Sequence, residues 1–285
     1  MSKRNISDDE FYVIGQQGQD SNDKKKKLLK IFLNVLAVLL CATVITLILQ
    51  FTVFRSTTKQ DDTEPIGKQN LGIDYPYVER LDTIVKGLEL TLYIPHNAFP
   101  SVTVGSPDST SLPDEAVLAF RAADLSPEGE LVGVFVCDGV VYQSKKESSS
   151  KTGYCAVIDG EITVGTAEST PLFEKAVEHN GGFFRQHSLV ADGKVMTTEG
   201  EYSNATLRRA LCERNGQVFV AVCKEGTMHN MAQALASLGV DEAVYLLGFT
   251  KSFNGWWRDA DGKVEFFRKS DEYSRYEYEN YIVWE

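Results

Sequence analysis

The segment 179–187 (HNGGFFRQH) contains the side chains of this sequence that are best suited to binding chemistry. Asn180 is followed by two glycines, beginning with Gly181, and a backbone without side chains lets a ligand or another strand approach closely. Asn180, Arg185 and Gln186 are able to orient sugar hydroxyls or a phosphate, and arginine suits bidentate phosphate binding. A glycine bulge in a core strand, with Arg185 in solvent, explains the same residues equally simply. The segment thus predicts either a sugar-phosphate site or a tightly packed strand.

Three more side chains further along the chain are candidates for chemistry. His187 and Lys251 are groups that exchange protons, which makes them candidate catalytic residues. Trp256 lies with Trp257 and Phe253 in an aromatic cluster, and the indole ring suits the flat apolar face of a sugar. Such a cluster also closes the edge of a core. Both interpretations of Trp256 remain open at this point.

Histidine and cysteine spacing gives no sign of a metal site. The four histidines have no ligand spacing and no CxxC pair occurs, so we expect neither a metal nor a cofactor. Four cysteines each lie in an apolar, strand-like run, where they fit two disulfides or four small buried hydrophobes. These are Cys137, Cys155, Cys212 and Cys223.

Residues 31–54 contain no charged side chain and are almost wholly apolar. A helix of this length reaches about 36 Å, which exceeds the ~30 Å hydrocarbon core of a bilayer. The sequence therefore predicts one transmembrane helix. Lysines cluster directly before the span, at 24–27 and 30. Because positively charged flanks remain on the cytoplasmic side, the N-terminal side of the span is expected to be cytoplasmic.

The chain is thus expected to have a cytoplasmic tail at 1–30, the span at 31–54, a linker at 55–72 and an extracytoplasmic part beyond. Its membrane is one expected partner. The formal net charge is −11, which argues against nucleic acid, because phosphate binding needs clustered lysine and arginine.

The outer part has the pattern of an α+β fold, with a mostly antiparallel sheet and two or three packed helices. Asp-Gly or Asn-Gly pairs, typical of tight hairpin turns, separate strand-like runs. Helices are expected at 172–178 and 228–238, the latter ending at Gly239. A buried strand is expected at 242–248 and an edge strand within 273–285. The hairpin pairs begin at Asp138, Asp159, Asp192, Asn215 and Asp261.

Residues 73–150 form the β-rich first part of this outer region and residues 151–285 the second. The periodicity leaves open whether 73–150 is a separate module or part of the same sheet.

The order of motifs after residue 153 resembles the phosphodiester glycosidase family. The resemblance is carried by the Asn-Gly-Gly-Phe-Phe strand at 180–184, the RRALCERNG hairpin from 208 and the helix that ends at Leu238-Gly239. It covers 153–257, under half of the chain. The segments RQHSLV and RRALC are similar to those of a membrane-anchored bacterial branch of this family. This similarity implies a bacterial inner membrane with the domain on the periplasmic side.

The resemblance implies cleavage of a sugar-1-phosphodiester, with Asn180 and Arg209 at motif positions that bind substrate. Where the family has Asp-Gly-Gly-Gly-Ser, this chain reads LGFTKS from Leu247. Leucine neither transfers a proton nor binds a metal. We therefore expect a single-pass protein whose domain binds or cleaves sugar-1-phosphodiester or glycan groups, with catalysis degenerate. The alternative is a non-catalytic envelope scaffold for a protein partner, with an exposed aromatic patch near Trp256.

Overall fold

The computed structural model describes most of the chain beyond residue 64. The described residues are 65–67, 72–105, 116–126, 128–143, 151–200, 202–247, 255–267 and 279–285, with residues 29, 30, 32–34 and 36. The chain divides into two compact units, Met1–Glu64 and Pro65–Glu285. The second unit carries the fold described below.

Most of the expected transmembrane segment lies outside the described residues, as do the expected tail and most of the linker. Within the described part of the chain, no helix is both long enough and apolar enough to cross a bilayer.

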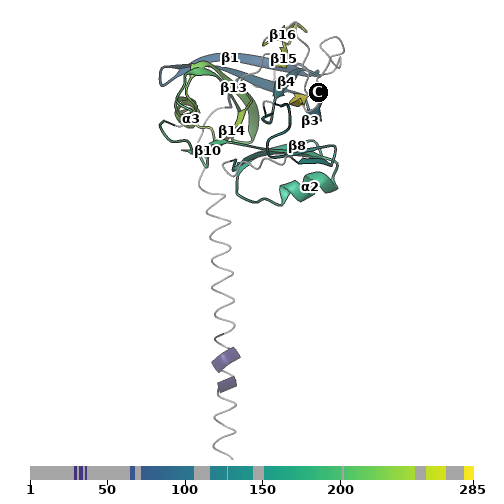
Figure 1. Cartoon of the computed structure of the whole chain (residues 1–285), viewed down its shortest axis with the longest axis vertical. Helices are drawn as coiled ribbons and strands as arrows, with labels where there is room; N and C mark the ends of the chain where they lie inside the picture. The colour runs from purple at the N-terminus through teal and green to yellow at the C-terminus, as the bar shows by residue number, and fades with distance from the viewer. Residues whose placement is uncertain are drawn as a thin grey trace, which may run out of the picture. The chain divides into compact units, whose positions relative to one another are not determined.

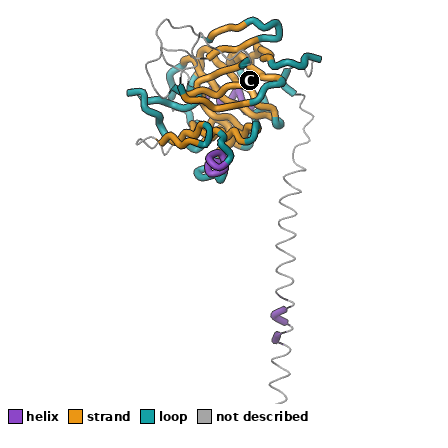
Figure 2. The backbone as a smooth tube through the Cα atoms, turned by 90° about the vertical axis from the view of Figure 1, so that its right-hand side faces the viewer, coloured by secondary structure: helices purple, strands orange, loops and turns teal. Residues whose placement is uncertain are grey.

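Three antiparallel sheets build the second unit (Figures 1 and 2). The first sheet has seven strands and provides the broad surface on which the others pack. In spatial order its strands are β1 (Tyr77–Val85), β2 (Leu88–His96), β13 (Gln217–Gly226), β12 (Thr206–Arg214), β14 (Glu242–Leu246), β10 (Ser188–Ala191) and β11 (Lys194–Val195).

The second sheet corrects one expectation from the sequence. Its strands run β16 (Val264–Phe266), β15 (Gly255–Arg258), β4 (Leu118–Arg121), β17 (Asn280–Trp284) and β3 (Pro100–Val104). We expected an edge strand within 273–285, but β17 pairs on both sides, with β4 and with β3. All five of its residues are buried. A continuous apolar run such as YIVW suits a strand that is covered on both faces, so the edge assignment was wrong.

The third sheet joins chain segments on either side of residue 150. Its strands run β6 (Val140–Gln143), β5 (Val134–Cys137), β9 (Gly182–Gln186), β7 (Gly153–Ile158) and β8 (Glu161–Thr166). β5 pairs with β9, β2 pairs with β13, and β4 pairs with β15. Every sheet therefore mixes strands from 73–150 with strands from 151–285.

Four of the five expected hairpin turns have the backbone that their residues favour. At Asp138-Gly139, Asp159-Gly160, Asp192-Gly193 and Asn215-Gly216, both residues have positive φ, between 48° and 80°. This is the left-handed geometry of a two-residue turn that matches strand twist. Asp261-Gly262 differs, because only Gly262 has positive φ, and it lies in a longer connection between β15 and β16. One further turn of the first kind, Lys86-Gly87, joins β1 to β2.

Both expected helices form. α2 spans Leu172–Glu178 and lies on the outer face of the third sheet (Figure 1), where Ala176 packs with Val136, Ala156 and Phe183. α3 spans Met228–Ser237, begins with a Thr227 side chain that accepts from the Asn230 N–H, and buries the methionine face. Gly239 follows at φ 81°, as expected of a helix C-cap.

The main core lies between the first sheet and the other two, while α3 covers the opposite face of the first sheet. The four described cysteines are free and buried, each in one of these two cores. Burial raises the pKa of Cys137 to about 11, so this thiol stays protonated at neutral pH. The cysteines act as small hydrophobes, the second of the two interpretations that the sequence allowed.

Candidate functional site

Arg209 is the sequence-predicted residue that the structure places in the most unusual surroundings. It lies on β12 and is 1% exposed, on the face that looks into the core. Its Nη1 donates to the Leu247 carbonyl oxygen over 3.2 Å, and its guanidinium lies 6.0 Å from the centre of the Phe120 ring. Burial, with Arg121 nearby, lowers the pKa of Arg209 to about 10. The side chain is thus a buried cation at neutral pH.

Arg208, the preceding residue, confirms that neighbouring positions on a strand face opposite sides. Its guanidinium donates to the carbonyl oxygens of Tyr202, Asn204 and Gly226 and to the Asn204 side chain. Arg208 therefore secures the loop that precedes β12, and only Arg209 turns to the space between the sheets.

The Ala122 carbonyl oxygen joins two motif segments that are far apart in the sequence. It accepts from the Leu247 N–H, at 3.2 Å, and from Gln186 Nε2, also at 3.2 Å. Leu247 directly follows the buried strand β14, and Gln186 ends strand β9, which begins at the second of the paired glycines. The segment that follows β4 therefore brings the Leu247 position next to the Asn-Gly-Gly-Phe-Phe strand.

An ion pair continues this network towards solvent. Gln186 Nε2 also donates to Asp124 Oδ1 at 3.1 Å, and Lys151 Nζ lies 2.6 Å from Asp124 Oδ2. The Lys151 side chain is 3% exposed and the Asp124 side chain 24%. Asp124 is thus the member of the network that water reaches.

A second ion pair lies at the start of the same segment. Arg121 Nη1 is 3.4 Å from Glu279 Oε1, and both side chains are fully buried. Tyr281 donates from its hydroxyl to Glu279 Oε2. We call the set that surrounds residues 121–124 the polar junction; its members are Arg121, Asp124, Lys151, Gln186, Arg209 and Glu279.

The charges of the polar junction define what it can bind. Three members are cations and two are carboxylates, and the ion pairs Arg121–Glu279 and Lys151–Asp124 join four of the five. Guanidinium groups are the side chains that best match phosphate oxygens. Within the described residues, no group of three histidine, cysteine or acidic side chains is arranged to hold a metal ion.

The paired glycines are packed rather than open to a ligand. A Cβ on Gly181 would collide with the Val157 carbonyl oxygen, and one on Gly182 would lie 2.6 Å from Val102 Cβ. Strand β7 on one side and strand β3 on the other thus need this pair to be glycine. Asn180 is exposed, with φ 53°, beside the Gly139 turn. Its N–H donates to the Val177 carbonyl oxygen, and among the described residues it does not contact the polar junction.

Arg185 and His187 point to other parts of the surface. Arg185 donates to the carbonyl oxygens of Ala167 and Glu168 at 2.7 and 3.0 Å, and burial lowers its pKa. His187 Nε2 lies 3.3 Å from the Tyr202 hydroxyl. The structure therefore does not gather these two side chains around Arg209. Gln186, which lies between them, is the residue of this strand that reaches the junction.

Trp256 belongs to the core. It is 1% exposed and packs with Ala119, Tyr281 and Val283, while Trp257 is 7% exposed. A ring this deeply buried is not available for stacking on a sugar, so the core interpretation holds. The exposed aromatic patch expected of a scaffold protein is likewise absent at these two tryptophans. Lys251 and Phe253 lie outside the described residues.

Sequence reasoning named Arg209 and Gln186 and missed the other four members of the polar junction, Arg121, Asp124, Lys151 and Glu279. Their signal was weak: Arg121 and Asp124 stand in FRAADL, where charged residues interrupt an apolar run. A charge inside a buried strand needs a partner. The charged residues in this apolar run indicated that they are buried. They did not identify Glu279 as the counter-ion of Arg121, because Glu279 lies far along the chain.

Comparison with known proteins agrees with the resemblance seen in the motifs and extends it. The sequence model of the phosphodiester glycosidase family matches residues 115–255, about half of the chain. This range begins before β4, so it includes Arg121 and Asp124 as well as Arg209. No curated protein matches the sequence.

Among solved structures, the chain is similar to the zebrafish N-acetylglucosamine-1-phosphodiester alpha-N-acetylglucosaminidase catalytic domain, auto-inhibited by its pro-peptide. Its TM-score is 0.47 at 11% identity, over 79% of this chain and 85% of that chain. A hypothetical protein from Synechocystis has a TM-score of 0.49 at 10% identity, over 74% of this chain and 62% of that one.

The family match includes strands β4, β9, β12 and β14 and every member of the polar junction except Glu279. It also contains the paired glycines and the helix that ends at Gly239. The chain therefore carries a domain of the phosphodiester glycosidase family, matched over residues 115–255.

Proposed function

We propose that this domain binds a sugar-1-phosphodiester at the polar junction and hydrolyses it slowly or not at all. The observation that carries the proposal is the hydrogen bond from Arg209 to the Leu247 carbonyl. It places the motif arginine directly beside the position at which the family has an acidic residue. The two guanidinium groups of the junction, Arg121 and Arg209, support binding of a phosphodiester anion, because guanidinium geometry matches phosphate oxygens.

The weakness of hydrolysis follows from the side chain at 247. Departure of the sugar or the alcohol needs proton transfer, which Leu247 cannot provide. Asp124 is the partly exposed carboxylate of the junction, and it forms an ion pair of 2.6 Å with Lys151. Its two oxygens are thus already engaged, one by Lys151 and the other by Gln186.

We further propose that the apolar segment 31–54 anchors the chain in a membrane with the domain on the extracytoplasmic side. The lysines that precede this segment support that orientation. Attachment of a bulky, water-soluble maleimide to a cysteine that replaces Ser270 or Ser2 in intact cells tests it. Labelling at 270 and not at 2 is the expected result, and the reverse pattern would overturn the orientation.

The functional test uses the full chain, purified in a mild detergent, with methyl N-acetylglucosaminyl phosphate and related diesters as ligands. We expect ligand-dependent thermal stabilisation with little released sugar, and faster release after Leu247→Asp. The loss of both signals in Arg209→Gln, but not in Arg208→Gln, would tie them to the junction. Rapid hydrolysis by the natural sequence would contradict the proposed degeneracy, and the absence of any binding would contradict the function.

A further inference from the structure

Strand β1 is an edge of the first sheet and the longest edge strand in the part of the chain that the structure describes. It has nine residues, whereas the other edge strands, β3, β6, β8, β11 and β16, have between two and six. β1 pairs with β2 alone, and the backbone of residues 80–85 forms no hydrogen bond with any other described segment. Unpaired N–H and C=O groups along an edge are a template for another strand. β1 therefore offers a pairing position to a further strand.

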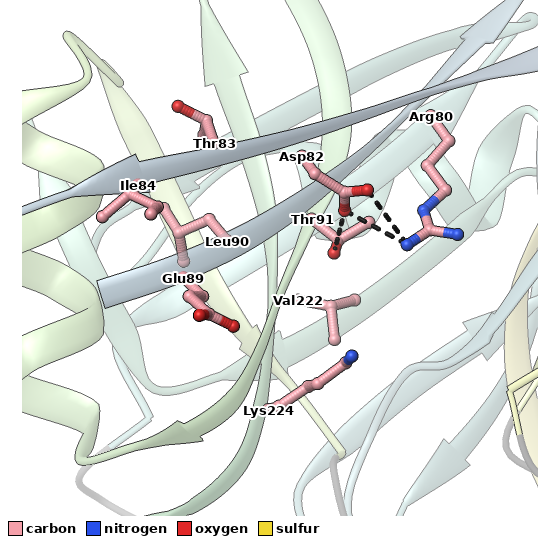
Figure 3. A pocket seen from close by; sticks show the side chains of 9 residues that line it. All are labelled: Arg80, Asp82, Thr83, Ile84, Glu89, Leu90, Thr91, Val222 and Lys224. Carbon is pink, nitrogen blue, oxygen red and sulfur yellow. Dashed lines mark hydrogen bonds and ion pairs between the residues drawn. The ribbon is translucent and has the colours of Figure 1, made fainter. Parts of the chain in front are cut away.

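The side chains on the two faces of β1 differ. Arg80, Asp82 and Ile84 are exposed and line a groove of about 620 Å³ (Figure 3). Leu81 is half-buried on the opposite face, where it packs against the core that α3 covers. The groove leaves space beside Arg80 and Asp82, so the side chains of a neighbouring strand have room there.

The two charged side chains of the edge are held by each other and by Thr91. Arg80 Nη2 lies 3.0 Å from Asp82 Oδ2, and Thr91 donates from its hydroxyl to Asp82 Oδ1 at 2.6 Å (Figure 3). The Thr91 hydrogen bond, helped by Arg80, lowers the pKa of Asp82, so this carboxylate is ionised at neutral pH. β1 therefore presents a cation and an anion on one face, with Leu81 between them in the chain.

A second copy of the strand is able to pair with β1 about a two-fold axis. In such an antiparallel pairing the same surface is used by both copies. Directly opposed residues share a face of the sheet, and successive residues of a strand alternate between faces. The axis must therefore pass through a residue that lies opposite itself. An axis between two residues would place side chains of opposite faces against each other.

Length and charge select the same residue for this axis. Leu81 is the middle residue of Tyr77–Val85, so an axis at Leu81 pairs the whole strand. It also places Arg80 opposite Asp82 of the second copy, and Asp82 opposite Arg80 of the second copy. Moving the axis to Arg80 or to Asp82 would place like charges opposite each other, which is unfavourable. The edge is thus complementary to itself in one register.

We propose that two copies of this chain associate through β1, in antiparallel register about Leu81, so that their first sheets join into one sheet. Arg80 and Asp82 of the two copies then form a ring of four alternating charges around the axis. Ile84, which is 69% exposed in the single chain, gains Val78 of the second copy as an apolar neighbour. Because both copies use the same edge, the association closes as a dimer. It uses no member of the polar junction.

The first test is sedimentation velocity of the full chain in a mild detergent over a series of protein concentrations. We expect a monomer–dimer equilibrium for the natural chain. Arg80→Asp and Asp82→Arg should each weaken the dimer about tenfold, because each converts two opposite-charge pairs into like-charge pairs. Lys263→Asp is the matched control: it makes the same change of charge in an exposed pair with Glu265 and should leave the dimer unchanged.

A mixture of the two charge variants separates cross-strand pairing from a general loss of structure. The Arg80→Asp chain alone places acidic side chains opposite one another, and the Asp82→Arg chain alone places basic ones so. A mixed dimer has opposite charges at every position, and we expect an equimolar mixture to regain the affinity of the natural chain. A natural chain that stays monomeric, or a dimer that both charge changes leave intact, would overturn the proposal.

Cross-linking tests the register without altering these charges. Leu81→Cys places two thiols opposite each other, where Cα atoms about 4.5–5.5 Å apart allow a disulfide. Thr83→Cys lies on the same strand and face, but the register separates its two copies by about 14 Å. We expect mild oxidation to give a covalent dimer with Leu81→Cys, above the level of the natural chain, and not with Thr83→Cys. Equal cross-linking of the two variants, or none with Leu81→Cys, would show that the register is wrong.

Discussion

Arg209 and Leu247 are joined by a hydrogen bond of 3.2 Å from the arginine side chain to the leucine backbone. The acceptor is a carbonyl oxygen, so the bond does not depend on the side chain at 247. Replacement of the family's acidic residue by leucine therefore leaves the position of Arg209 intact. Under the proposed function, binding and hydrolysis are therefore separable, since Arg209 is present and residue 247 is a leucine.

The first prediction concerns the two neighbouring arginines of β12. Arg209→Gln should abolish binding of methyl N-acetylglucosaminyl phosphate, because it removes the buried cation of the polar junction. Arg208→Gln should weaken the 202–204 loop and leave that binding unchanged. Calorimetric titration of both variants, with thermal unfolding as a check on folding, distinguishes them. Equal loss of binding in both would show that β12 acts only as a structural strand.

The second prediction concerns the buried pair of Arg121 and Glu279. Arg121→Met should reduce the free energy of unfolding by about 3–5 kcal/mol, because it leaves a buried carboxylate without its cation. Arg121→Met combined with Glu279→Gln should cost less than the sum of the two single changes. Denaturant unfolding of the four proteins measures this coupling. Lys263→Met, which removes one member of an exposed pair with Glu265, should leave the midpoint unchanged.

The third prediction concerns the contact between Gly182 and Val102. Gly182→Ala should destabilise the fold by about 1–3 kcal/mol, because its Cβ would lie 2.6 Å from Val102 Cβ and overpack the core. Val102→Ala makes room on the opposite strand. The double variant should therefore be more stable than additivity predicts, as measured by denaturant unfolding. Strict additivity would mean that the two strands move apart instead.

The fourth prediction concerns pH and Glu242. Burial is the main cause that raises the pKa of Glu242, and Asp192 and Glu213 add to it. A raised pKa in the folded state means that the protonated form is favoured there. Stability from this group is therefore present at low pH and is lost as pH rises through the folded-state pKa.

Glu242→Gln should accordingly raise the melting temperature at pH 7 to 8, and its advantage should shrink as the pH falls towards 4. Glutamine can still accept from the Asp192 N–H, which Glu242 Oε1 accepts at 2.9 Å. The exposed Glu161→Gln should show no such pH-dependent difference. A constant difference between Glu242→Gln and the natural protein at all pH values would contradict the assignment.

The fifth prediction concerns the turn between β1 and β2. Lys86 has φ 50°, a left-handed conformation that lysine adopts at a cost and asparagine adopts readily. Lys86→Asn should raise the free energy of unfolding by about 0.5–1 kcal/mol, the scale of a backbone preference at one turn residue. Lys86→Ala is the control and should give no gain. If both variants behave alike, the effect comes from loss of the lysine charge.

Local features of the fold were predictable because short-range rules determine them. The turn at Asp159-Gly160, the helix α2 and the cap at Gly239 all depend on residues within a few positions of one another. The Lys86-Gly87 turn was missed because lysine is not a typical turn residue at that position. The backbone needs left-handed geometry there, and Gly87 alone was the clue.

The polar junction was less predictable because it depends on pairings over long distances. The partners Ala123 and Asn280, whose hydrogen bonds fix β17 beside β4, are 157 residues apart in the sequence. Nothing near Arg121 indicates that its counter-ion is Glu279. The paired glycines of 181–182 were correctly identified as a close approach, but the partner is protein and not a ligand.

The position of β17 has a consequence for synthesis of the protein. The second sheet has β17 in its interior, between β4 and β3, so these two strands have no partner on their facing edges until residues 280–284 have left the ribosome. Closing such a long loop is slow, and unpaired strand edges attract other chains meanwhile. Until β17 inserts, the facing edges of β3 and β4 are therefore open to pairing with other chains.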